Sequence, residues 1–134
     1  MPSRSLRTVV AVSVLALAGL AGCGGGGGDD PGASAGCRTA QDGRVEVVAK
    51  GVAWDTDCLE APAGALTIVV DNRDDGVSHN LHLTDAPDGP KTDLEAGPVT
   101  QELDVSLDVG AYEYVCDIHP NMVGTLTVSD ANPG

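Results

Sequence analysis

Short runs in which apolar and polar residues alternate recur from residue 37 onward, and they predict β-strands rather than helices. Clusters of Gly, Pro, Asp and Asn separate these runs. The predicted strands cover residues 44–49, 66–70, 80–83, 99–109, 111–116 and 123–128. No longer stretch keeps a helical period, although one helical turn around residues 93–96 is compatible with the sequence. Short strands at this spacing predict an all-β sandwich of about seven or eight strands.

The start of the chain has a different pattern, which predicts an export signal. Two arginines precede an uncharged, apolar run over residues 8–20, and this run is shorter than the roughly 20 residues that span a bilayer. The run ends in Leu-Ala-Gly-Cys at residues 20–23, which is similar to the lipobox of bacterial lipoproteins. That resemblance implies that Cys23 is acylated and becomes the mature N-terminus. The alternative is an ordinary secretory signal with a coincidental cysteine.

These features divide the chain into segments. Residues 1–22 form the predicted signal peptide, and residues 23–36 form the lipid-modified cysteine and a Gly-rich tether that cannot build a core. The folded domain covers residues 37–130, and residues 131–134 form a short C-terminal tail. We therefore expect an extracytoplasmic protein that a lipid anchors to a bacterial membrane, at the outer face of the cell membrane or in the periplasm.

Length and charge narrow the class of protein further. A chain of 134 residues can build one core, which excludes a two-domain enzyme. Lys and Arg total 7 and Asp and Glu total 20, so the formal net charge is −13. This charge excludes nucleic acid and an anionic membrane surface as electrostatic partners. It favours a basic patch on a partner protein, or serves solubility alone, and we expect the chain to be a monomer.

Three metal-ligating side chains lie close together near the C-terminus. Cys116, His119 and Met122 offer a thiolate, an imidazole and a thioether in one loop between two predicted strands. Soft ligands of this kind select copper over hard cations. Alone, Cys116 would be read as a buried thiol and Met122 as core filling, but their spacing around His119 favours ligation. A second imidazole would have to come from His79 or His82, which point to opposite faces of a regular strand.

Residues 110–128 resemble the C-terminal motif of the cupredoxins, closest to the amicyanin and plastocyanin branch, and the Cys-x2-His-x2-Met spacing is most similar to amicyanin. Residues 71–74 and 78–80 resemble the segment that carries the family's first histidine, although Ser78 stands where many relatives have Pro. The resemblance implies a Greek-key β-sandwich and one copper ion per chain, with Asn80 hydrogen-bonding to the cysteine loop and stiffening the site. The implied ligands are His79, Cys116, His119 and Met122.

The remaining residues of interest have structural interpretations. The resemblance selects His79 as the ligand and leaves His82 as a surface or partly buried strand residue. In an oxidising compartment, Cys37 and Cys58 are expected to form a disulfide, and two free thiols are the alternative. The acidic clusters are either solvated turns or a docking face for a basic partner.

The sequence thus favours a mononuclear type 1 copper protein that carries single electrons between extracytoplasmic redox partner proteins. A second hypothesis is a lipoprotein that carries, stores or senses copper without electron transfer. A third is a metal-free interaction module. A single cysteine in the loop disfavours a binuclear copper site, and three histidines in the whole chain disfavour a copper oxidase, so we expect a protein that is not an enzyme.

Overall fold

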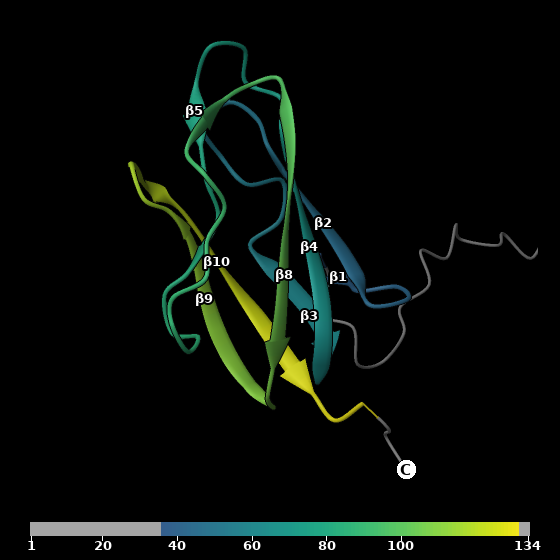
Figure 1. The fold of residues 1–134 in the computed structure, drawn as a ribbon. Coiled ribbons are helices and arrows are strands. Elements are labelled where there is room, and N and C mark those ends of the chain that lie inside the picture. The colour runs from purple at the N-terminus through teal and green to yellow at the C-terminus, as the bar shows by residue number, and fades with distance from the viewer. Residues whose placement is uncertain (1–35, 132–134) are drawn as a thin grey trace, which may run out of the picture.

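Ten β-strands account for the secondary structure of residues 36–131, the part of the chain that the computed structural model describes. The strands are β1 (Arg38–Thr39), β2 (Arg44–Ala49), β3 (Cys58–Pro62), β4 (Gly64–Asn72), β5 (Ser78–His79), β6 (His82–Leu83), β7 (Glu95–Ala96), β8 (Val99–Leu107), β9 (Gly110–Cys116) and β10 (His119–Ser129). No helix in this range is long and apolar enough to cross a membrane. The predicted all-β sandwich is confirmed (Figure 1).

The strands pair into two main sheets. One holds five strands in the order β1-β3-β10-β9-β6, the other holds three in the order β2-β4-β8, and the short strands β5 and β7 pair with each other. β10 is antiparallel to β9 and parallel to β3, so the chain crosses between the sheets rather than forming successive hairpins. Figure 1 shows that β5 and the turn between β9 and β10 lie at the same end of the sandwich.

Aliphatic side chains fill the space between the sheets, as expected for a chain that contains no phenylalanine. Val45 and Val47 on β2 face Leu126 and its neighbours across the core, and all three are buried. Tyr114 on β9 is the largest fully buried side chain, and its hydroxyl donates a hydrogen bond to the carbonyl of Thr56 (2.6 Å). Because β9 continues to Cys116, this packed tyrosine fixes the strand that leads into the candidate site.

The structure departs from the sequence analysis in several elements. Strands β1, β3 and β5 were missed, because β1 and β5 contain two residues each and β3 is defined by its pairing with β1 and β10. The strand predicted over residues 80–83 is confined to His82–Leu83. The helical turn considered around residues 93–96 is wrong, because Glu95 pairs there with His79 in the β5–β7 ladder. Ten strands are present rather than seven or eight, and four of them contain two residues each.

A disulfide joins Cys37 to Cys58 across a sequence separation of 21 residues. It ties the start of the domain to β3 and contributes about 3 kcal/mol in the chain-entropy model. The predicted signal peptide, the lipid-modified Cys23 and nearly all of the tether lie outside the described residues.

Candidate metal centre

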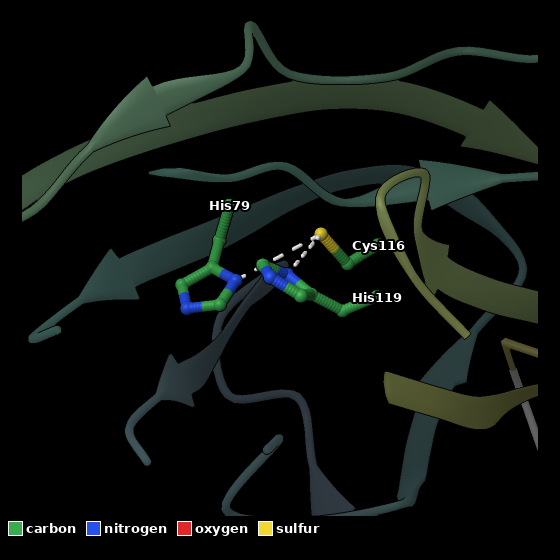
Figure 2. Close-up of side chains that lie close together, drawn as sticks. All are labelled: His79, Cys116 and His119. Atoms are coloured by element: carbon green, nitrogen blue, oxygen red, sulfur yellow. Dashed lines mark hydrogen bonds between the residues drawn. The ribbon is translucent and has the colours of Figure 1, made fainter. Parts of the chain in front are cut away.

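Three side chains from three strands meet at one end of the sandwich. His79 comes from β5, Cys116 ends β9 and His119 begins β10. Their ligand atoms all lie within 4.8 Å of one another. Cys116 Sγ is 3.8 Å from His79 Nδ1 and 3.5 Å from His119 Nδ1, so both rings present the same type of nitrogen to the sulfur (Figure 2).

The local fold explains why these side chains converge. Cys116 and His119 are partners in the antiparallel β9–β10 ladder, and the register then shifts between His119 and Val123. His79 is held by the short ladder between β5 and β7. His79 and Cys116 are buried, whereas His119 is partly exposed, so the cluster opens to the surface on one side only.

Met122 lies in the irregular segment after His119 and is fully buried. It forms a small apolar cluster with Ala49 and Cys116, apart from the main core, and Val52 and Trp54 pack against this cluster. The sequence predicts Met122 as a ligand, and the structure brings it into the same cluster as Cys116.

Asn80 bridges the two segments that supply the ligands. Its Nδ2 donates to the carboxylate of Asp117 (2.9 Å), and its Oδ1 accepts the backbone N–H of the same residue (2.9 Å). Asp117 lies between Cys116 and His119, so this pair of hydrogen bonds connects the His79 segment to the cysteine loop. These are hydrogen bonds to the cysteine loop of the kind that the family resemblance implies for Asn80.

His82 is not brought to the cluster. Its Nδ1 donates to Asp117 Oδ1 (2.7 Å), and Lys91 approaches the other oxygen of that carboxylate (3.3 Å). The hydrogen bond from Asn80, followed by that from His82, lowers the pKa of Asp117 to about 2. His82 is therefore a partly buried strand residue with a structural partner.

Asp74 is a residue of the site that the sequence did not single out, although it lies in the segment 71–74 that resembles the family. Its Oδ2 accepts hydrogen bonds from His79 Nε2 (2.8 Å) and from the N–H of Val52 (2.8 Å), and its Oδ1 accepts the N–H of Gly51 (2.6 Å). The backbone hydrogen bonds from Val52 and Gly51, followed by that from His79, lower the pKa of Asp74 to about 2. The signals in the sequence were a carboxylate five residues before a candidate ligand histidine and the place of Asp74 in the segment 71–74.

The donor set fits a soft or borderline transition metal. A buried cysteine that is not in a disulfide, two imidazole nitrogens and a buried thioether are the ligands that favour copper. Calcium or magnesium would require oxygen ligands, and none of these four side chains offers one.

The comparisons with known proteins agree with this fold. A model of the cupredoxin-like domain family matches residues 13–128, so the chain belongs to this family. A reduced amicyanin variant has a similar structure, with 24% identity and a TM-score of 0.55 over 67% of this chain and 86% of amicyanin. The reduced Cu(I) form of another amicyanin variant is 25% identical over the same shares, with a TM-score of 0.55.

A larger protein shares the fold in part. The copper-containing nitrite reductase from Thermus scotoductus SA-01 is 24% identical, with a TM-score of 0.56 over 66% of this chain, but only 23% of the reductase is covered. A search of curated proteins found no match. The predicted membership of the cupredoxin family, and the likeness to its amicyanin branch, are thereby confirmed.

Proposed function

We propose that this protein is a mononuclear type 1 copper protein that carries single electrons. The observation that carries the proposal is the convergence of Cys116 Sγ with the Nδ1 atoms of His79 and His119, all within 4.8 Å. Two histidines and one cysteine with a weak axial methionine are the ligands of blue-copper sites, and Met122 is buried beside them. When bound, copper would supply a one-electron redox centre.

The protein's contribution is to hold these ligands in place. Hydrogen bonds to Asn80 and Asp74 fix the two segments that carry the ligands, and β9 and β10 fix the loop between them. A site held in this way changes little between oxidation states, which favours rapid electron transfer. One histidine remains beyond the proposed ligands, so the chain has no further histidine cluster for a separate catalytic copper site. This supports an electron carrier rather than an enzyme.

The spectrum of the copper-loaded protein tests the proposal. One equivalent of Cu(II) is expected to give an intense visible thiolate-to-copper band and a narrow copper hyperfine splitting in EPR. A faint spectrum typical of tetragonal Cu(II), or no binding, would contradict electron transfer through a type 1 site. Copper that binds without the intense band and passes readily to a chelator would instead support the carrier hypothesis.

His119 is the proposed port through which electrons enter and leave. It is the partly exposed member of the cluster, and its sequence neighbour Ile118 has an exposed apolar side chain. The His119→Gly variant should still bind copper, but its electron exchange with a small redox reagent should slow by at least about tenfold, or about 1.4 kcal/mol in the barrier. The His82→Gly variant is the control, and equal rates for the two variants would reject the port.

The redox partner is proposed to present a basic surface. The formal net charge of −13 would attract such a surface over long range, and salt would screen the attraction. The rate of electron transfer to a true partner should therefore fall as ionic strength rises. A rate independent of salt would leave the acidic residues with a role in solubility only.

The lipid anchor at Cys23 and the extracytoplasmic location are proposals that rest on the sequence of residues 1–23. Protein extracted from membranes should carry acyl chains on an N-terminal peptide that begins at Cys23, as measured by mass spectrometry. The Cys23→Ala variant should not carry them. An unmodified peptide that begins elsewhere would reject the anchor.

A further inference from the structure

The imidazole of His79 has a partner on each of its two nitrogens. Nδ1 faces Cys116 Sγ at 3.8 Å, and Nε2 lies 2.8 Å from the Asp74 carboxylate. Figure 2 shows the second nitrogen of this ring directed away from the sulfur. We propose that Asp74 is a positioning residue that fixes the tautomer and orientation of His79 and lowers the reduction potential of the copper site. The part that concerns the potential rests on the proposed function.

A strained turn holds the Asp74 carboxylate in place. Gly51 and Val52 have positive φ angles of 65° and 54°, so their successive N–H groups both point at the carboxylate. A β-branched residue such as Val52 rarely adopts this conformation, because it costs free energy. Its presence here indicates that the surrounding contacts determine the shape of the turn.

The same turn also contacts the other end of the site. The carbonyl of Val52 accepts a hydrogen bond from Asn121 Nδ2 (2.7 Å), and the Val52 side chain packs against the apolar cluster of Ala49, Cys116 and Met122. The turn therefore joins the segment of His79, through Asp74, to the loop that carries the remaining proposed ligands. Movement of the carboxylate would break three hydrogen bonds at once.

This arrangement has two chemical consequences. Because an ionised carboxylate can only accept hydrogen bonds, His79 Nε2 carries the proton, and in the neutral ring Nδ1 then keeps its lone pair toward Cys116. That tautomer is the one that can ligate a metal, and a carboxylate behind it makes the imidazole a stronger ligand. The negative charge also favours the more highly charged Cu(II) state over Cu(I), which lowers the potential.

Asp74→Asn tests the effect on the potential, and Asp75→Asn is the matched control. Both variants remove one negative charge from neighbouring positions, but Asp75 is exposed, whereas Asp74 is mostly buried against His79. Asp74→Asn should weaken the preference for Cu(II) over Cu(I) by at least about tenfold, which raises the potential by about 59 mV. Asp75→Asn should change it less than about threefold. Equal shifts in the two variants would overturn a specific role for Asp74.

The tautomer is tested in the metal-free protein by NMR of the imidazole nitrogens. The wild-type protein should show His79 with its proton on Nε2, and Asp74→Ala should show a mixture of tautomers. If Asp74→Ala does not fold, Asp74→Asn is used instead, and it should also show a mixture, because an amide can both donate and accept a hydrogen bond. An unchanged tautomer in the variant, or a mixture already present in the wild type, would overturn the inference. This measurement stands whether or not the copper-loaded wild type shows a thiolate band, so it separates failure of the inference from failure of the proposed function.

Discussion

Replacement of Cys116 by serine is expected to abolish the intense visible band of the copper-loaded protein. The band requires a thiolate bound to copper, and Cys116 is the one cysteine in residues 36–131 that is not in the disulfide. Serine fills nearly the same buried volume and leaves His79 and His119 in place. We therefore expect residual Cu(II) binding with absorption reduced on the order of tenfold or more, measured by titration with Cu(II) and visible spectroscopy.

Met122→Leu is the control for this loss. Leucine keeps the apolar contact with Cys116 but removes the thioether, which is the weak ligand in sites of this class. The intense band should persist in Met122→Leu and disappear in Cys116→Ser. If Cys116→Ser keeps the band, the thiolate is not its source and the type 1 assignment is wrong.

The loop that carries Cys116, His119 and Met122 is the part of the site that the sequence predicts most directly. These residues lie within seven positions of one another in a single loop, so their side chains are close together whatever the rest of the fold. Spacing alone does not select the second histidine. His79 and His82 are three positions apart, and a regular strand turns them to opposite faces. The structure places His79 against Cys116, as the family resemblance implies. His82 instead bonds to Asp117, a contact that the resemblance did not predict.

The contacts around these residues depend on pairings between distant segments. Asp74 meets the turn at Gly51 and Val52 across more than twenty residues of sequence. In sequence, an acidic turn that makes such a contact cannot be distinguished from one that faces solvent. Strand β3 was missed for a related reason. Its five residues become a strand by lying between β1 and β10, and neither partner is adjacent to it in sequence. Local patterns predict which residues are apolar or ligating, but not which distant segments they meet.

Replacement of Gly124 by alanine is expected to have the largest effect on stability. Gly124 on β10 lies directly opposite Tyr114 on β9, and a Cβ at this position would fall within 3.0 Å of three atoms of the tyrosine ring, including its hydroxyl oxygen. The ring has no room to move, because Tyr114 is fully buried and its hydroxyl is bonded to the carbonyl of Thr56. Overpacking of this kind costs about 1–3 kcal/mol, and loss of the buried hydrogen bond adds to it.

Gly110→Ala is the matched control, because a Cβ there would meet the ring of Tyr112 at 3.7 Å, an ordinary contact. In urea unfolding, Gly124→Ala should lose about 3 kcal/mol or more relative to wild type, and Gly110→Ala less than about 1 kcal/mol. The loss should be smaller when the tyrosine is already absent, so Gly124→Ala in a Tyr114→Leu background measures the coupling between the two positions. Equal losses with and without the tyrosine would show that the glycine serves another purpose. A smaller loss in the Tyr114→Leu background would show that the glycine makes room for the buried tyrosine, and hence supports the strand that ends at Cys116.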